Sequence, residues 1–370
     1  MNDKAEILDK WIGKTVIKSN RRYAYEEVQA MIEGGEGDYK DEIMILNDLA
    51  TKLREKRMAQ GSINFHSEEV KFILDEKMHP IDTYVKVQQE ANMLIEDFML
   101  LANRTVAEAI GKKDSKYQGY TFVYRVHDEP NPEKLYNFIA LVSKLGYSMN
   151  ISTREKLVKS YNALFEAVEG KGERNLVESV ALRTMAKAQY STVNIGHYGL
   201  AFPFYTHFTS PIRRYPDLMV HRLIERYLIE NQTSVNREEY EVLCQHASEM
   251  ERKAAEMERE SVKYKQAEYL QDKIGKVFDG LISGLSKWGI YVELKDSKCE
   301  GLVRYSTLDD MYYIDEENFR VIGQYTNKIY RLGDAVKVRI EAVDLIKKQM
   351  EFTLVKESSK NRHRGVPSRG

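Results

Sequence analysis

Hydrophobic positions recur every three to four residues over much of the chain, which predicts a largely helical body. The helical patterns cover residues 41–60, 90–110, 132–145 and, as a long charged stretch, 237–270. The segment EANMLIEDFMLLANRTVAEAI is apolar over most of its circumference and therefore predicts a buried helix. In the third pattern, Asn131 is the expected N-cap, Pro132 the first helical residue and Gly146 the stop signal.

The long charged helix carries a stripe of smaller and apolar residues at alternating spacings of four and three. These are Leu243, Ala247, Met250, Ala254, Met257, Ser261 and Tyr264. Such a stripe is typical of a coiled-coil seam. Because it contains two alanines and a serine, we favour a single helix that lies along the body of its own domain.

Alternation with a period of two predicts strands in two regions. In the first region these are TVIKSN (15–20), VKFILDE (70–76) and IDTYVKV (81–87). In the second, five short strands with glycines at bends follow Asp272 and predict a small β-barrel. The expected fold class is therefore α+β: a mixed body with long helices over 1–270, then a five-stranded barrel over 271–356. The ending KESSKNRHRGVPSRG has five basic residues and one acid, and predicts a disordered basic tail over 357–370.

Composition limits the possible partners and compartment. Lys+Arg of 56 against Asp+Glu of 57 gives a formal charge of -1, so an argument for a nucleic-acid partner must rest on local features. Cys244 and Cys299 have no metal-ligand spacing, which argues against a disulfide scaffold or zinc site and for a reducing compartment. No apolar run approaches the ~18 residues of a membrane span. We therefore expect a cytoplasmic protein with no membrane partner.

The stretch HFTSPIRRYPD, residues 207–217, places two adjacent arginines between two prolines. Ser210-Pro211 predicts an extended-to-turn geometry, and Pro216 predicts the start of a helix. Arg213 and Arg214 then approach a helix N-terminus, where free N–H groups and the macrodipole favour an anion. Guanidinium groups at that place could bind a phosphate in bidentate fashion. For Arg214, a structural ion pair with Asp217 is an equally good interpretation.

Several segments together resemble a known family. GHYGLA, HFTSPIRRYPDLMVHR, GSINFHSEEVKFILDE and EANMLIEDFMLLAN resemble the signature of the ribonuclease II and ribonuclease R family of 3′-to-5′ exoribonucleases. GLISGLSKWGIYVEL, EGLVRYSTL and YRLGDAVKVRIEAVD resemble the S1 RNA-binding domain, an OB-fold. The resemblance covers essentially the whole chain. It implies the C-terminal portion of an RNB catalytic domain over 1–270 and an S1 domain over 271–356.

This resemblance implies a function for particular residues of the body. Single-stranded RNA would be hydrolysed processively to nucleoside 5′-monophosphates by a monomer. Arg213 would hold the scissile phosphate, with Arg214 as a second contact. Glu96 would contact the sugar of the terminal nucleotide through the 2′-OH, although a buried carboxylate paired with an arginine is an alternative. Phe65 would stack on the last bases, and a core phenylalanine is the alternative.

In the barrel, the resemblance points to a second RNA-binding surface. Phe278, Trp288 and Tyr291 would offer flat π surfaces to bases, while Arg304 and Arg339 would meet phosphates. Arg304 stands where the S1 pattern usually has a histidine. Aromatic residues at these spacings can instead belong to the barrel core.

The chain departs from the family in its metal ligands. The family holds Mg²⁺ with a D-x-D-D cluster of aspartates, and no such pattern occurs in this sequence. The opening ILDKWIGKTVIKSNRRYAYEEVQAMI instead resembles the middle of the family's catalytic domain. We therefore expect that Mg²⁺ belongs to the full-length enzyme and that the N-terminal half of the catalytic domain is a missing partner. This chain alone would bind RNA without cutting it.

Two other functions remain open. The chain could be a non-catalytic protein that binds RNA through the S1 barrel and the basic tail. A metal phosphodiesterase could also be built on His207, Asp217 and His221, since the last two lie one helical turn apart. We favour the metal phosphodiesterase least, because its three residues belong to a motif of the family, and the metal ligands of the family lie elsewhere in the catalytic domain.

Overall fold

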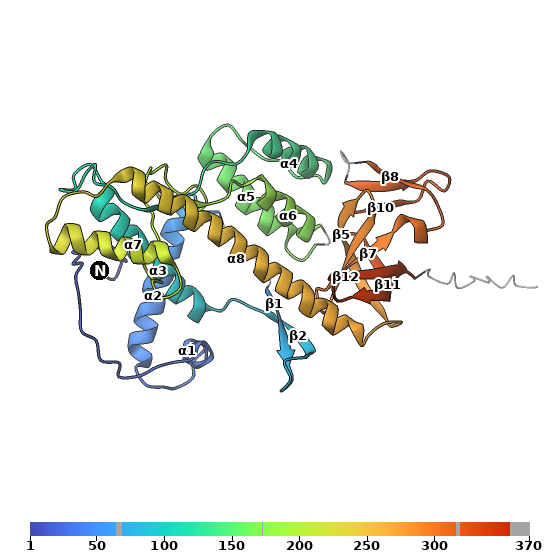
Figure 1. Ribbon diagram of the computed structural model, residues 1–370, viewed down its shortest axis with the longest axis horizontal. Helices are drawn as coiled ribbons and strands as arrows, with labels where there is room; N and C mark the ends of the chain where they lie inside the picture. Colours follow the sequence, from blue (N-terminus) through green and yellow to red (C-terminus); the bar gives the residue numbers. More distant parts are fainter. Residues whose placement is uncertain (64–68, 172, 316–318, 356–370) are drawn as a thin grey trace, which may run out of the picture. The chain divides into compact units, whose positions relative to one another are not determined.

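The computed structural model describes residues 1–63, 69–171, 173–315 and 319–355 (Figure 1). The chain divides into two compact units. The first consists of Met1–Glu69, Lys86–Glu169 and Val177–Glu258, and the second of Val70–Val85, Gly170–Leu176 and Arg259–Gly370. The basic tail predicted for 357–370 lies outside the described residues.

The first unit is mainly helical. Its helices are α1 (Tyr25–Ile32), α2 (Lys40–Ala59), α3 (Glu90–Gly111), α4 (Pro132–Lys144), α5 (Arg154–Val168), α7 (Tyr215–Ile224) and a π-helical turn (Glu225–Ile229). Helices α6 (Arg174–Thr184) and α8 (Arg237–Gln271) have residues in both units. A small antiparallel sheet pairs β3 (Tyr124–Val126) with β4 (Gln189–Ser191). The helices predicted from the hydrophobic pattern are thus confirmed.

The ends of α4 follow the predicted capping signals. The Asn131 side chain accepts a hydrogen bond from the backbone N–H of Lys134 at 3.0 Å, and Pro132 is the first helical residue. Gly146 follows the helix with a φ of +89°, in the left-handed region that favours glycine.

Helix α3 is buried or half-buried along nearly all of its length, as expected, and its fully buried residues lie on one face. Its buried residues are Ala91, Leu94, Asp97, Leu100, Asn103, Val106, Ala107 and Ile110. On the other side, Ile95 is 42% and Met99 37% exposed.

The stripe on α8 is partly buried near the start of the helix and exposed farther along. Leu243 and Ala247 pack against the core cluster of the first unit, which includes Phe122, Leu223 and Tyr227. Farther along, Met257 is 72% exposed. The prediction that the whole stripe lies along its own domain is therefore wrong beyond the first turns of the helix.

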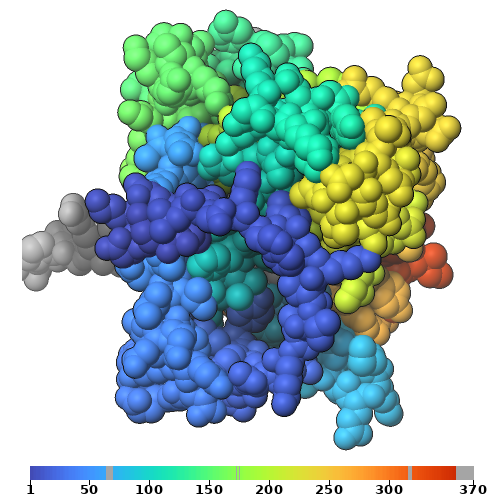
Figure 2. Space-filling view, turned by 90° about the vertical axis from the view of Figure 1, so that its left-hand side faces the viewer, coloured from blue at the N-terminus to red at the C-terminus, as the bar shows by residue number. Residues whose placement is uncertain are grey.

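The strand predicted over residues 15–20 does not form. Val16 is fully exposed and Ile17 is 86% exposed, in a segment that crosses the surface of the first unit (Figure 2). Just before it, Lys14 forms an ion pair with Glu225 of the same unit. A strand needs a neighbour for its backbone hydrogen bonds, and no strand in the described part of the chain pairs with this segment.

The second unit contains the predicted five-stranded barrel. Its strands are β5 (Val277–Ser286), β6 (Gly289–Leu294), β7 (Glu300–Arg304), β11 (Ala335–Asp344) and β12 (Gln349–Leu354). The barrel closes in the order β11-β12-β7-β6-β5, with β12 and β7 parallel and the other pairs antiparallel. A separate antiparallel sheet of β8 (Tyr312–Asp315), β9 (Arg320–Gly323) and β10 (Ile329–Arg331) was not predicted. The fold is α+β, as expected.

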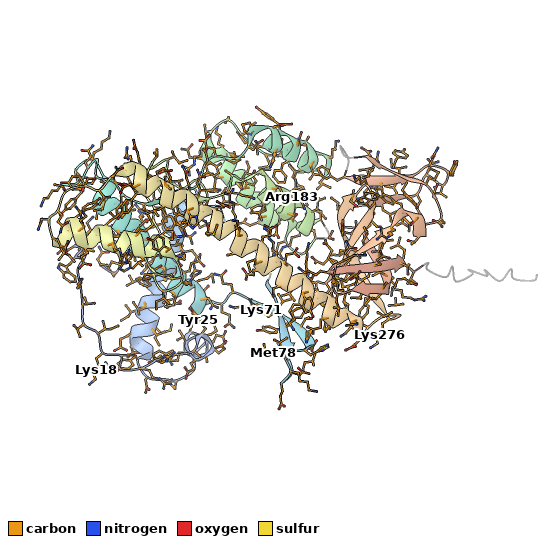
Figure 3. All side chains as sticks on the ribbon, viewed as in Figure 1. Lys18, Tyr25, Lys71, Met78, Arg183 and Lys276 are labelled. Carbon is orange, nitrogen blue, oxygen red and sulfur yellow. The ribbon has the colours of Figure 1, made fainter. Side chains whose placement is uncertain are left out.

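A predicted pair of strands, β1 (Glu69–Leu74) and β2 (Pro80–Lys86), also forms. Met78 lies in the turn between them, with a φ of +65° and 62% of its surface exposed (Figure 3). Phe72 contacts the ring of Tyr269 edge-on at a centroid distance of 6.3 Å. Among the described residues, no helix is long and apolar enough to cross a membrane.

Candidate functional site

The two adjacent arginines lie in a tight turn directly before α7. The carbonyl oxygen of Ser210 accepts hydrogen bonds from the backbone N–H groups of Arg213 at 3.3 Å and Arg214 at 3.0 Å. Arg214 is the N-cap residue of α7, and Pro216 occupies its first turn. The geometry predicted from the two prolines is therefore present, and both arginines stand at a helix N-terminus.

The two arginine side chains have different surroundings. Arg214 donates from Nη2 to Asp217 Oδ1 at 2.7 Å, and the fully buried Asp217 also accepts from the backbone N–H of Ser210 at 2.8 Å. Since a buried carboxylate needs a charged partner, Arg214 is engaged in a structural ion pair. Arg213 is exposed, and its side chain makes no hydrogen bond or ion pair with any described residue. Arg213 is thus available to an external anion.

The loop that carries the arginines is fixed at Phe208. Its backbone N–H donates to Asn103 Oδ1 at 2.9 Å, and its carbonyl accepts from His221 Nε2 at 2.9 Å. Its ring stacks on that of His221 at a centroid distance of 4.1 Å. Asn103 also donates to Tyr205 Oη at 3.2 Å. Sequence reasoning did not assign this role to Asn103, although its place in the apolar face of α3 was a signal.

A cluster of rings lies behind the loop. Tyr190 Oη and His207 Nδ1 share a hydrogen bond of 2.8 Å, and the His207 ring lies 5.7 Å from Tyr205, which lies 5.3 Å from His197. Burial, together with the charges of Arg214 and Arg125, lowers the pKa of His207 to about 2. Burial and the neighbouring His127 lower the pKa of His197 to about 3. Both imidazoles are therefore neutral at pH 7.

Arg125 is a further cation near this cluster that sequence reasoning missed. Its two terminal nitrogens donate to the carboxylate of Glu251 at 2.5 and 3.0 Å. The guanidinium also lies over the ring of Tyr190, 4.7 Å from its centroid. Because both of its terminal nitrogens are already used, Arg125 orders the site rather than offering a free charge.

His207, Asp217 and His221 do not form a metal site. Each already binds protein atoms: His207 the Tyr190 hydroxyl, Asp217 the arginine and a backbone N–H, and His221 a backbone carbonyl. Over residues 1–63, 69–171, 173–315 and 319–355, no three His, Cys, Asp or Glu side chains group as metal ligands. The interpretation as a phosphodiesterase with a metal on these residues is therefore wrong. The described residues also do not fit the Mg²⁺ that the family resemblance implies.

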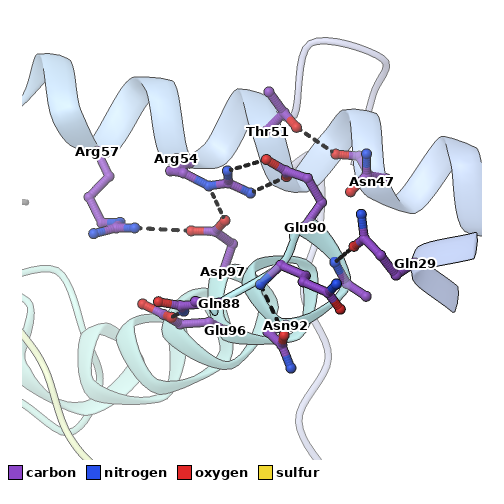
Figure 4. Close-up of polar contacts among 12 residues, drawn as sticks. Gln29, Asn47, Thr51, Arg54, Arg57, Gln88, Glu90, Asn92, Glu96 and Asp97 are labelled. Carbon is purple, nitrogen blue, oxygen red and sulfur yellow. Dashed lines mark hydrogen bonds and ion pairs between the residues drawn. The ribbon is translucent and has the colours of Figure 1, made fainter. Parts of the chain in front are cut away.

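On α3, the structure separates two neighbouring carboxylates (Figure 4). Asp97 is buried and accepts from Arg54 Nε at 2.9 Å and from Arg57 Nη2 at 3.2 Å. Glu96 is partly exposed and accepts from Gln88 Nε2 at 2.6 Å. The alternative interpretation of Glu96, a buried carboxylate paired with an arginine, therefore describes its neighbour Asp97 instead. Glu96 remains accessible to a ligand.

The predicted aromatic partner Phe65 lies outside the described residues. Ser62, three positions earlier in the sequence, joins three segments of the first unit: its Oγ accepts from Arg57 Nη1 and donates to the carbonyl of Gly199, each at 3.2 Å. The salt bridge between Arg57 and Asp97 is therefore connected through Ser62 to the GHYGLA segment.

In the barrel, three of the five predicted residues line one groove of about 540 Å³. They are Trp288, Tyr291 and Arg304. Trp288 is 63% exposed, which rules out the barrel core for this residue. Arg304 donates to Glu351, with 2.8 Å between its Nε and the carboxylate. Phe278 packs against the barrel core and Arg339 is exposed on β11; neither lines this groove.

Comparison with known proteins places these features in a family. The family model described as RNB domain matches residues 1–230, more than half of the chain, and the model described as S1 RNA binding domain matches residues 271–354. Ribonuclease R of Aquifex aeolicus is 39% identical over 359 residues, which cover 95% of this chain and 50% of that protein. Ribonuclease R of Escherichia coli is 32% identical, over 96% of this chain and 45% of that protein.

A solved structure has the same fold. The structure described as Mycoplasma genitalium RNase R in complex with ribose methylated single-stranded RNA superposes with a TM-score of 0.82 at 28% identity. The match covers 90% of this chain and 53% of the other. The chain spans about half the length of the curated relatives it matches. The chain belongs to the RNB domain family and carries an S1 RNA binding domain after its RNB domain.

Proposed function

We propose that this chain binds single-stranded RNA and supplies the phosphate clamp of a processive 3′-to-5′ exoribonuclease that releases nucleoside 5′-monophosphates. The observation that carries the proposal is the difference between the two arginines. Arg214 is held by the buried Asp217, whereas Arg213 is exposed beside the N-terminus of α7. The helix terminus and the guanidinium group together favour a phosphate at this place. Arg214 supports the clamp by fixing the turn.

The terminal nucleotide would lie near α3. Glu96 has only a glutamine as its hydrogen-bond partner in the described residues, so it can exchange this partner for a 2′-OH group. Phe65 would stack on a terminal base, which suits an enzyme that degrades any sequence.

The barrel would hold RNA farther from the clamp. Trp288 and Tyr291 offer stacking surfaces in the groove, and Arg304 would meet a phosphate. Phe278 and Arg339 are weaker members of this surface, since the structure places them outside the groove.

Cleavage would require residues beyond this chain. Hydrolysis of a phosphodiester by bound Mg²⁺ requires clustered carboxylates, and the described residues contain no such cluster. We therefore propose that Mg²⁺ and an N-terminal half of the catalytic domain complete the active enzyme. The length of the relatives and the exposed apolar residues Leu8, Trp11, Val16 and Ile17 support this proposal. The chain alone would be inactive.

A second candidate is a non-catalytic RNA-binding protein. The exposed Trp288 in the barrel groove fits it equally well. Both functions agree with a monomer in the cytoplasm, a reducing compartment that suits the two free cysteines.

Both candidates are tested by titrating a labelled single-stranded RNA with the chain over a range of salt concentrations. Several phosphate contacts should give a logarithmic salt slope of several units. Absence of binding at low salt would contradict both candidates. The DNA upstream of the reading frame separates them: an in-frame D-x-D-D sequence favours the exoribonuclease, and a stop codon favours the binder.

A further inference from the structure

The barrel groove has a second wall that does not belong to the barrel. One side is formed by strands β6, β7 and β12, with Tyr291 on β6, and by Trp288 in the turn between β5 and β6. The other side is formed by Glu260, Lys263 and Gln266 of α8. These three residues recur at a spacing of three, which places them on one side of the helix. All residues of the groove belong to the second unit.

Two contacts hold this part of α8 against the barrel. Lys348, in the turn between β11 and β12, forms an ion pair with Glu260 at 2.6 Å. Gln266 donates from Nε2 to the carbonyl of Lys298 at 3.3 Å. Below them, Ala267 and Leu270 are fully buried in the core cluster of the barrel. The helix is thus a fixed wall, and the groove volume of about 540 Å³ lies within the usual ~300–1,000 Å³ of ligand sites.

Lys263 differs from the other cations of the groove in its ion pairing. Arg304 is paired with Glu351, Lys348 with Glu260, and Lys347 with Asp344. For Lys263, the described residues provide no carboxylate within ion-pair distance. The nearby Glu260 is already engaged, and Lys348 is the main reason why the pKa of that carboxyl is lowered.

We propose that α8 forms half of an RNA-binding groove, in which Lys263 contacts a backbone phosphate while a base stacks on Trp288. The groove combines an exposed aromatic surface with a lysine that forms no ion pair with a carboxylate of the described residues, and this combination binds single strands without sequence preference. Gln266 orients the helix wall through its bond to Lys298. This inference rests on the proposed function, because it assumes that the barrel surface binds RNA.

A tryptophan reporter can test the groove directly. The chain has two tryptophans, so the variant Trp11→Phe leaves Trp288 as the single one. Trp11 is 72% exposed in the N-terminal segment, and its replacement should not disturb the fold. Oligouridylate, a single-stranded RNA, should quench the fluorescence of Trp288 on binding. In this background, Lys263→Ala should weaken binding about 3- to 10-fold and reduce the logarithmic salt slope by about one unit.

Lys253→Ala is the matched control. Lys253 lies on the same helix, is exposed, pairs with Glu249 and does not line the groove. Its replacement should leave affinity within about 2-fold, as expected for a charge outside the contact. Equal affinities for the two lysine variants, with Trp288 still quenched, would overturn the role of α8 and leave the barrel surface intact. RNA binding seen by anisotropy without quenching would instead contradict the proposed barrel surface itself.

Discussion

Arg214 and Asp217 form an ion pair across the first turn of α7, with 2.7 Å between Nη2 and Oδ1, and the carboxylate is fully buried. Arg213, one residue earlier, is exposed and has no such partner among the described residues. The two adjacent arginines therefore have different surroundings. Arg214 stabilises the turn, whereas the exposed Arg213 is the residue that we propose binds a phosphate.

The first prediction concerns stability. Arg214→Ala should lower the free energy of unfolding by about 3–5 kcal/mol, because it leaves Asp217 buried and unpaired. Arg213→Ala should change it by less than about 0.5 kcal/mol, as is usual for an exposed side chain. Urea titration of both variants measures the difference. If Arg214→Ala and Arg213→Ala destabilise the chain equally, the ion pair between Arg214 and Asp217 does not stabilise the turn.

The second prediction concerns RNA affinity. Arg213→Ala should weaken the binding of single-stranded RNA about 10-fold, since it would remove the proposed charge-assisted phosphate contact. Arg222→Ala, at the other end of α7 and also exposed, serves as the control and should have little effect. Equal RNA affinity of the two variants would show that Arg213 does not hold a phosphate.

The third prediction separates the carboxylates of α3. Asp97→Asn should lower the free energy of unfolding by about 3–5 kcal/mol, because Arg54 and Arg57 would lose their shared charged partner. Glu96→Gln should leave stability within about 0.5 kcal/mol but reduce the preference for RNA over DNA of the same sequence. An unchanged preference in Glu96→Gln would contradict the proposed sugar contact.

The fourth prediction concerns pH. His207 and His197 have folded pKa values of about 2 and about 3, against an ordinary value of 6.5. Below pH 6.5 the unfolded chain therefore binds protons that the folded chain does not, and stability falls as the pH falls. The expected slope approaches about 1.4 kcal/mol per pH unit for each histidine. The carboxyls of Glu108 and Glu241 have lowered pKa values and add their effect only at more acidic pH.

Urea unfolding between pH 7.5 and about 5 measures this slope. His207→Asn should reduce the slope of the free energy of unfolding against pH by the contribution of one histidine. The exposed His246, replaced in the same way, should leave it unchanged. A slope that is identical in the parent and in His207→Asn would show that His207 is not kept neutral by the fold.

The fifth prediction concerns the thiols. Burial raises the pKa of Cys244 to about 12 and that of Cys299 to about 11. Because the thiolate is the reactive form, neither should react quickly with an aromatic disulfide reagent in the native chain, whereas both should react in urea. Rapid reaction of one thiol in the native chain would place that cysteine outside the core.

The elements with strong local signals could be predicted from the sequence. The caps of α4 and the five barrel strands follow from residue types at fixed positions. The segment at 15–20 shows the limit of this approach. Val16 and Ile17 have the pattern of a strand, but a strand also depends on a neighbour that a local pattern does not contain.

The pairings among the candidate site residues could not be predicted from the sequence. A helical pattern could not show whether Glu96 or Asp97 faces the arginines, because this depends on which side of α3 meets α2. Likewise, the partner of Arg304 is Glu351, which lies 47 positions away in the sequence and comes close through the parallel pairing of β7 and β12. Long-range contacts of this kind leave no local signal.

The most direct test of the central proposal combines binding and cleavage. A labelled single-stranded RNA is incubated with the chain in Mg²⁺, beside a binding titration over a range of salt. We predict binding with a logarithmic salt slope of several units and no shortening of the RNA, because we propose that Arg213 holds a phosphate and the described residues contain no metal cluster. Mg²⁺-dependent shortening from the 3′ end would contradict this account and show that carboxylates of this chain do hold the metal.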